Sequence, residues 1–279
     1  MASFLALFSS LLWGAADYLG GNLTKRYKSL AVTGASQSFG LLFGIAAILI
    51  SSSYLAPTTS WSGYLLPGIF AGTLGFIGLT AFYAGLATGR MGVVSPISSL
   101  SALIPLTIAF IKGEQPTTLQ LTGMAVALTG AFCASGPEIK GGISARPLIY
   151  AVIAAFGFGG AVSFIAIGSQ TSAIMTMTTM RLTTFVISLI LFIRFKTAGG
   201  FTKRDLPVLI CIGGADFAGN LLLGVATTKG LVSLAVVLGS LFPIVTALLA
   251  YKLLHERLHK LQYLGIAFAI TGVALIAAG

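Results

Sequence analysis

Charged residues are scarce in this sequence. Asp, Glu, Lys and Arg together make up 8% of its 279 residues, whereas a soluble globular domain has about 25%. Hydrophobic residues reach 56%, and the mean hydropathy is +1.00. A chain of this composition cannot cover an apolar core with a polar surface, so a soluble globular domain is excluded. We predict an all-α integral membrane protein that crosses the bilayer several times.

Cysteine is almost absent as well. Cys133 and Cys211 both lie in apolar runs, and no Cys-x-x-Cys spacing occurs. A disulfide framework, a cysteine-based zinc site and a thioredoxin-like redox motif are therefore not indicated. The sequence also has no Gly-x-x-x-x-Gly-Lys-Ser/Thr loop, so ATP-driven transport by this chain alone is not expected. We predict no cofactor.

Acidic residues are few, six against sixteen basic ones, which gives a net charge of +10. In a soluble chain this excess would suggest a nucleic-acid partner. Here the basic residues lie between apolar runs, with no basic stripe carrying interleaved aromatic residues. We therefore predict a lipid bilayer and a small-molecule solute as partners, and no nucleic acid.

Histidine occurs only in the segment His255-Glu256-Arg257-Leu258-His259. This segment matches His-Glu-x-x-His, the pattern that places two zinc ligands and a general base on one helix. A catalytic zinc needs a third protein ligand, and the other acidic residues form no partner motif. We interpret the segment as a connector in which Glu256 accepts backbone N–H bonds at the start of the last helix. An intramembrane zinc protease is the alternative.

Ten apolar runs are bounded by charged or turn residues. Each is close to the roughly 20 residues that a helix needs to cross a bilayer. The 35 glycines indicate close packing between these helices. We predict membrane spans near residues 3–21, 31–50, 62–86, 91–111, 119–136, 147–167, 173–195, 207–227, 231–254 and 261–278.

The chain also contains an internal duplication. Residues 224–279 have a weaker copy in residues 85–136, with these matches: Gly92 and Gly230, Pro105 and Pro243, Glu114 and Glu256, Gln120 and Gln262, Gly123 and Gly265. No histidine accompanies Glu114. The duplicated feature is therefore the glutamate after an inter-helix turn rather than a metal site.

The duplication extends to the rest of the chain. Trp13-Gly14 resembles Phe156-Gly157, and Gln37 falls near the position that Arg181 has in the second copy. Each half then holds five spans, in repeats that cover residues 1–140 and 141–279. An odd number of spans inserts the second copy upside down. We predict two inverted five-helix repeats, a construction that many secondary transporters use for alternating access.

The basic residues also predict the orientation. Lys112 and Lys229 lie on one side of the predicted membrane, thirteen basic residues lie on the other, and Arg181 lies within a span. Cytoplasmic loops carry the excess of Lys and Arg. We therefore expect a multi-pass protein of the cell inner (plasma) membrane with both termini outside.

Several of these residues resemble a known family. They are Trp13-Gly14-Ala15, Arg181, Pro243, His255-Glu256-Arg257-Leu258, Gln262, Gly265 and Thr271-Gly272-Val273. Together they resemble the drug/metabolite transporter superfamily, specifically its ten-helix EamA-type members. His255 departs from this pattern, since the family usually has Gly there. The resemblance implies a transporter, favours export, and implies a solute cavity lined by the first, third, fourth, sixth, eighth and ninth spans.

Charged residues inside spans are candidates for function, because each costs about 2.5–3.5 kcal/mol at the centre of a membrane helix. Arg181 and Asp216 fall near mid-membrane on consecutive helices. They can form a pair that locks two helices or one that lines a solute cavity. Asp17 follows Trp13 by four residues and so shares its helix face. The alternative for Asp17 is a solvated acid at a helix end, near Lys25 and Arg26.

Polar and aromatic residues complete the predicted cavity. We expect its polar lining to include Ser95, Ser98, Asn220 and Ser240, and its apolar walls to include Trp13, Tyr83, Phe156 and Phe158. Ordinary packing is the alternative for each aromatic residue. A mixed cavity of this kind suits small amphipathic solutes, amino acids among them.

These observations favour a secondary transporter over an enzyme. If protons are the coupling ion, Asp216 is the first candidate carrier and Asp17 the second, because both lie within the membrane. A passive channel or facilitator is the alternative, since inverted repeats also build channels. The sequence does not indicate an oligomeric state.

Overall fold

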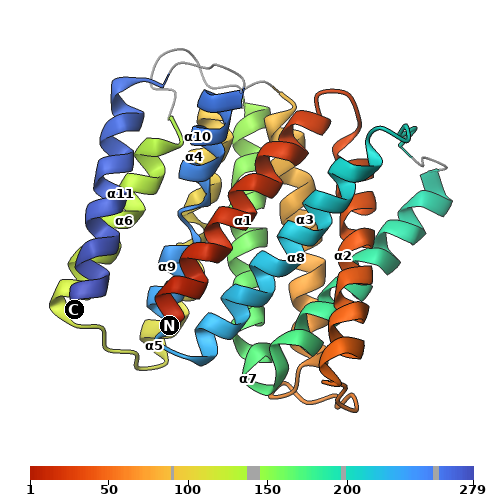
Figure 1. Ribbon diagram of the computed structural model, residues 1–279, viewed down its shortest axis with the longest axis horizontal. Helices are drawn as coiled ribbons and strands as arrows, with labels where there is room; N and C mark the ends of the chain where they lie inside the picture. The colour runs from red at the N-terminus through yellow and green to blue at the C-terminus, as the bar shows by residue number, and fades with distance from the viewer. Residues whose placement is uncertain (89–90, 137–144, 196–198, 254–257) are drawn as a thin grey trace.

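The computed structural model describes residues 1–88, 91–136, 145–195, 199–253 and 258–279. These residues form a bundle of α-helices and contain no β-strand (Figure 1). Helices suit these apolar sequences, because a helix satisfies its own backbone hydrogen bonds where water is absent. Both chain ends lie toward the same end of the bundle, opposite the loop between α1 and α2 (Figure 1).

Most predicted spans correspond to helices whose bounds agree within a few residues. The uninterrupted helices are α1 (Ala2–Leu23), α2 (Ser29–Ser51), α3 (Leu65–Leu86), α6 (Thr118–Ala134), α8 (Leu206–Thr228) and α11 (Lys260–Ala278). Counting interrupted helices as one each, eight helices of the described chain are long and apolar enough to cross a membrane. Helix α6 is apolar but has 17 residues. The expected all-helical, apolar architecture is confirmed.

Helix α7 (Ala145–Phe195) covers two predicted spans. Its backbone is non-helical at Ser172, where φ is −163° and ψ is 114°. The chain reverses direction near this residue, so that the two parts of α7 run in opposite directions (Figure 1). The first part packs against α3, and the second part packs against both α2 and α3.

Two helices are interrupted ahead of a proline. Helix α4 (Met91–Ser99) continues through the 3₁₀ turn η1 (Leu100–Ala102) into α5 (Leu103–Ile111), which contains Pro105. Helix α9 (Val232–Gly239) is separated from α10 (Phe242–Leu253) by Ser240 and Leu241, just before Pro243. Proline has no N–H to donate to the carbonyl four residues earlier, so the helix is weakened there. Because Pro105 matches Pro243 in the duplication, the two interruptions occupy matching places in the two copies.

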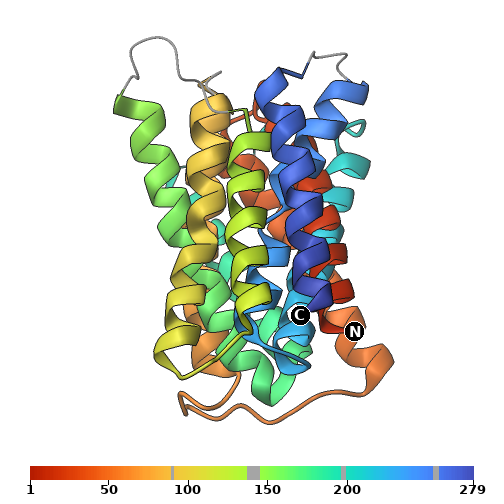
Figure 2. The same cartoon turned by 90° about the vertical axis from the view of Figure 1, so that its left-hand side faces the viewer.

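Helices α6 and α11 pack through duplicated glycines and lie side by side (Figures 1 and 2). A Cβ added at Gly123 would lie 2.9 Å from the Gly272 carbonyl oxygen, and one added at Gly130 would lie 2.7 Å from the Gly265 carbonyl oxygen. Gly123 matches Gly265 in the duplication, and Gly130 matches Gly272. Exchanging the two copies therefore reproduces the same pair of contacts. Any larger side chain would force these helices apart.

Asp205 connects the two halves at the end of the bundle that holds the α1–α2 loop. Its carboxylate accepts hydrogen bonds from Arg26 Nη2 at 2.7 Å, from the Tyr27 hydroxyl at 2.7 Å, and from the backbone N–H and hydroxyl of Thr202 at 2.9 and 2.7 Å. The Thr202 and Tyr27 hydroxyls hold the pKa of Asp205 well below its usual range, and the bond from Tyr27 raises the pKa of that phenol. Asp205 is thus a buried carboxylate with its donors in place.

Glu114 connects the halves at the opposite end. Its Oε1 and Oε2 accept hydrogen bonds from the backbone N–H groups of Val232 and Ser233, at 2.8 and 2.9 Å. Both N–H groups belong to the first turn of α9, where backbone N–H groups have no acceptor within their own helix. The duplicated glutamate of the first copy therefore caps a helix of the second copy.

Candidate solute-binding cavity

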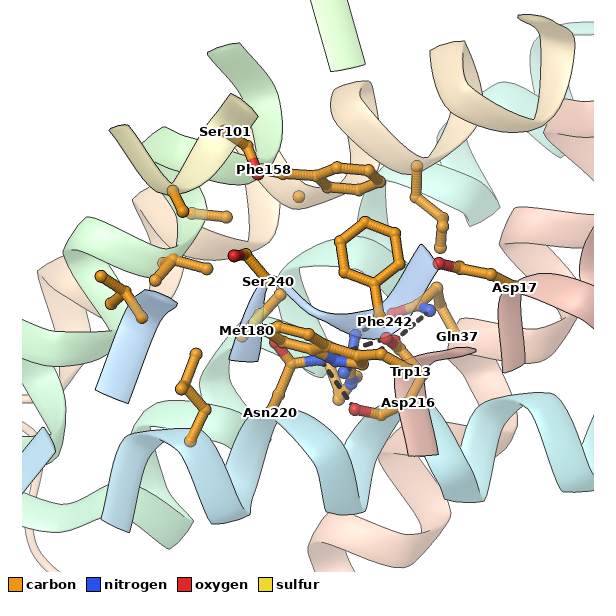
Figure 3. Close-up of a pocket in the computed structure, with 18 residues that line it drawn as sticks. Trp13, Asp17, Gln37, Ser101, Phe158, Met180, Asp216, Asn220, Ser240 and Phe242 are labelled. Carbon is orange, nitrogen blue, oxygen red and sulfur yellow. Dashed lines mark hydrogen bonds and ion pairs between the residues drawn. The ribbon is translucent and has the colours of Figure 1, made fainter. Parts of the chain in front are cut away.

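A cavity lies between the two halves at the level of the interrupted helices (Figure 3). It has room for several water molecules. Its lining comes from α1, α2, α3, η1, α7, α8, α9 and α10. It includes Ser101 and Ala102 from one interruption, Ser240 from the other, and Phe242 at the start of α10. Both copies of the duplication therefore contribute to the same cavity.

Arg181 and Asp216 form the predicted ion pair at one wall of this cavity. Arg181 Nη2 lies 2.9 Å from Asp216 Oδ2, and the Arg181 side chain is only 1% exposed. Asp216 also accepts hydrogen bonds from Gln37 Nε2 at 2.8 Å and from Asn220 Nδ2 at 3.1 Å. Arg181 Nη1 donates to Gln37 Oε1. The Gln37 amide thus bridges the two charged groups, which offset each other.

Asp17 differs from Asp216 in having no such partners. It lies one helical turn after Trp13 on α1, is 8% exposed and lines the cavity. Among the residues that the structure describes, none donates a hydrogen bond to its carboxylate or forms an ion pair with it. Figure 3 shows the carboxylate directed toward the space beside Phe242. The alternative of a solvated acid near Lys25 and Arg26 is therefore wrong, and Arg26 instead contacts Asp205.

Aromatic rings form much of the apolar wall. Trp13 and Phe242 meet edge to face with ring centroids 6.3 Å apart, and Phe82 lies behind Phe158 and Phe242 at centroid distances of 5.6 and 6.5 Å. Trp13, Phe158 and Phe242 line the cavity. Edge-to-face packing holds these rings in fixed orientations.

Four predicted lining residues do not line this cavity. Phe156 is 67% exposed on the outer surface of α7, because it lies about 200° around the helix from Phe158. Tyr83 is buried against Phe82 and the α1 backbone at Gly20, behind the cavity wall. Ser95 and Ser98 lie on α4, before the turn η1, and Ser98 donates to the Val94 carbonyl at 2.8 Å. Only the interruption itself, at Ser101 and Ala102, reaches the cavity from this segment.

The structure adds lining residues that the sequence analysis did not single out as site residues. These are Gln37, Ser101, Met180 and Phe242, besides small and aliphatic residues. A signal was present for Gln37, which matches Arg181 in the duplication and contacts it in the structure. Phe242 is adjacent to the duplicated Pro243. For Met180 we find no comparable signal.

Among the described residues, none from the histidine segment lines this cavity. His255 and Glu256 lie outside the described residues, and the backbone N–H of His259 donates to Gln262 Oε1 at 2.9 Å at the start of α11. Thr117 and Gln120 form the same contact at the start of α6, at 3.0 Å. Within the described part of the chain, no cluster of three or more His, Cys, Asp or Glu residues could hold a metal ion.

Comparisons with known proteins relate this chain to a family and its fold to a solved structure. The model of the EamA-like transporter family matches residues 1–136 and again residues 145–278. No curated protein matches the chain significantly. A solved structure, described only as the crystal structure of a protein, superposes with a TM-score of 0.80 and covers 99% of this chain and 96% of its own. The two sequences are 17% identical, so this likeness shows the fold alone. The family match covers nearly the whole sequence, and the chain therefore belongs to the EamA-like transporter family of the drug/metabolite transporter superfamily.

Proposed function

We propose that the protein is a secondary transporter that carries small amphipathic metabolites, amino acids or related compounds, by alternating access. The observation that carries this proposal is the position of the cavity. It lies between the two copies of the duplication, at the level of two interrupted helices, and it contains charged groups. Interrupted helices in matching positions of two halves are typical of transporter binding sites. We assign the protein no enzymatic activity, in line with its family.

The proposed mechanism requires two inverted repeats, residues 1–140 and 141–279. Ten crossings result if α7 counts as two, and if α4, η1 and α5, and likewise α9 and α10, count as one each. The glycine contacts of α6 and α11 support an axis in the membrane plane, because exchanging the copies reproduces them between antiparallel helices. Rocking the repeats about this axis would open the cavity to one side and then to the other.

We further propose that both termini face outward in the cell inner (plasma) membrane. The loop between α1 and α2 and the residues before α8 carry Lys25, Arg26, Lys28, Lys203 and Arg204 at one end of the bundle. The chain ends lie toward the other end (Figure 1). Positive loops stay in the cytoplasm. Export as the direction of transport is supported by the resemblance to EamA-type transporters.

If transport is coupled to protons, the structure favours Asp17 over Asp216 as the carrier, which reverses the order expected from the sequence. Protonation of Asp216 would leave Arg181 buried without a counter-charge, and such a charge is costly. Asp17 has no cationic partner to lose among the described residues. A carboxylate in this setting can alternate between binding a proton and binding solute.

The experiment is a thermal-shift screen followed by a flux measurement. Detergent-solubilised protein is screened against the standard amino acids and their decarboxylated amines, because a ligand of the folded state raises Tm. Hits are then tested in proteoliposomes with an imposed pH gradient. We expect at least one hit to accumulate above its external concentration and above the level that protein-free liposomes reach under the same gradient. Equilibration without accumulation under every imposed gradient would indicate a passive facilitator and contradict the proposal.

A further inference from the structure

The cavity lining has more carboxyl groups than cations. Its described lining includes two carboxylates, Asp17 and Asp216, and a single cation, Arg181. Arg181 is buried and offset by Asp216 at 2.9 Å. The second carboxyl group, that of Asp17, has no cationic partner among the described residues.

The surroundings of Asp17 are those expected of a ligand-binding residue. Its side chain is more than nine-tenths buried, faces the cavity and has no donor among the described residues (Figure 3). Burying an unpaired carboxylate is costly unless a cation or a proton neutralises it. Asp205 shows what a purely structural buried aspartate looks like in this protein, with four hydrogen bonds. Asp17 lacks all of them.

The walls beside Asp17 suit an organic cation. Trp13 lies one helical turn before it on α1, and Phe242 packs edge-on against Trp13. Aromatic faces attract ammonium groups, most strongly where water is excluded. Farther into the cavity the lining is aliphatic, with Leu79 and Leu223 among its residues. A carboxylate next to aromatic rings, followed by an apolar space, matches a charged head group on an apolar body.

An anionic solute finds no equivalent partner. The Arg181 guanidinium contacts Asp216 and Gln37 through its Nη atoms, and its Nε, which has no hydrogen-bond partner among the described residues, is buried and not open to the cavity. The Ser240 hydroxyl donates to the Val237 carbonyl, and the Asn220 amide donates to Asp216. No lining residue of this described cavity offers an uncompensated positive charge. A solute carboxylate would therefore face Asp17 without a counter-charge of its own.

We propose that the solute is a small organic cation, an amine or quaternary ammonium compound with an apolar body, whose charged group binds Asp17 beside Trp13 and Phe242. This proposal rests on the proposed transport function and narrows it. It separates decarboxylated amines from amino acids, because an amino acid brings a carboxylate for which the cavity has no free partner. Asp17 is then the residue that determines specificity for charge.

The test uses four probes with one phenylalkyl frame: 2-phenylethylamine, phenylalanine, 2-phenylethanol and 3-phenylpropanoate. Calorimetry on the purified full-length protein measures their affinities. We expect 2-phenylethylamine to bind about 10- to 100-fold more tightly than 2-phenylethanol, the range that a charge-assisted contact provides. Phenylalanine should bind more weakly than the amine, and 3-phenylpropanoate should bind most weakly.

Two variants test the assignment to Asp17. Asp17→Asn should reduce the affinity for 2-phenylethylamine to that for 2-phenylethanol, and Asp17→Glu, which keeps the charge, should retain the preference for the amine. Equal affinities of the four probes for the wild-type protein would overturn the proposal, as would unchanged amine binding by Asp17→Asn. The wild-type comparison needs no variant, so it stands even if Asp17→Asn does not fold.

Flux in proteoliposomes separates this inference from the proposed function. Accumulation of 2-phenylethanol or 3-phenylpropanoate without binding of the amine would overturn the cation assignment and leave the transporter intact. Binding of the amine at Asp17 without flux of any probe would support the cation site and contradict transport.

Discussion

Asp205 and Asp17 are both buried aspartates, with 3% and 8% of their surface exposed, but their surroundings differ. Asp205 lies just before α8 and accepts four hydrogen bonds from Arg26, Tyr27 and Thr202. Asp17 lies within α1 and faces a cavity, with no donor among the described residues. A buried carboxylate that accepts hydrogen bonds from the protein stabilises the fold. A buried carboxylate without such donors can instead be stabilised by a bound ligand that supplies them. Burial alone therefore does not identify a functional acid.

Asp216 stands between these two cases. It lines the same cavity as Asp17, yet it pairs with Arg181 and accepts hydrogen bonds from Gln37 and Asn220. Its surroundings resemble those of Asp205 more than those of Asp17. We therefore expect Asp216 to behave mainly as a structural group, and stability measurements can sharpen this distinction.

The largest loss of stability is expected for Arg181→Met. Removing the guanidinium leaves Asp216 as a partly buried carboxylate without its partner, which costs about 3–5 kcal/mol of unfolding free energy. Thermal or denaturant unfolding in detergent measures the loss. The double variant Arg181→Met/Asp216→Leu should recover most of it, because both charges are gone. Equal losses in the single and double variants would show that the pair is not coupled.

A smaller loss is expected for Asp205→Asn, measured as a lower Tm at pH 7. The pKa of Asp205 is depressed by its hydrogen bonds, chiefly from Thr202 and Tyr27. Its stabilising contribution is therefore complete above the usual carboxyl pKa of about 3.9 and is lost as pH falls through the lower, folded-state pKa. The difference in Tm between wild type and variant should shrink below about pH 4. A difference that stays constant into that range would contradict a charged Asp205.

The smallest effect on stability is expected for Asp17→Asn. Because Asp17 has no donor to lose among the described residues, the variant replaces a buried carboxyl group without breaking a contact. Its Tm at pH 7 should equal or exceed that of the wild-type protein in the absence of solute. A loss as large as that of Asp205→Asn would show that Asp17 is a structural acid, and the distinction drawn here between Asp17 and Asp205 would then be wrong.

Much of the fold was predictable because apolar runs separated by charged residues define membrane helices directly. The pairing of Arg181 with Asp216 was also predictable, since isolated charges within a membrane need compensation. The direction in which each side chain points around its helix axis was not predictable from the sequence. Helix α7 is apolar on most of its surface, so Phe156 and Phe158 could not be assigned to outside and inside from their sequence.

The interruptions were harder to locate than the helices. Pro105 and Pro243 marked the two helices concerned, but the segments that reach the cavity lie a few residues earlier, at Ser101–Ala102 and Ser240. The sequence predicts Ser95 and Ser98 in the cavity, because a polar residue in a span suggests a polar environment. Ser98 instead satisfies its hydroxyl within its own helix, at the Val94 carbonyl.

The most direct test of the account is the accumulation of labelled 2-phenylethylamine in proteoliposomes under an imposed pH gradient, measured as the excess over protein-free liposomes, because a weak base alone distributes according to a pH gradient. Wild type, Asp17→Asn and Asp205→Asn are compared at equal amounts of folded protein. We predict that wild type and Asp205→Asn accumulate the amine above the level in protein-free liposomes and that Asp17→Asn does not. Accumulation by Asp17→Asn at the wild-type rate would contradict the central claim that solute binds at Asp17 in the cavity between the two repeats.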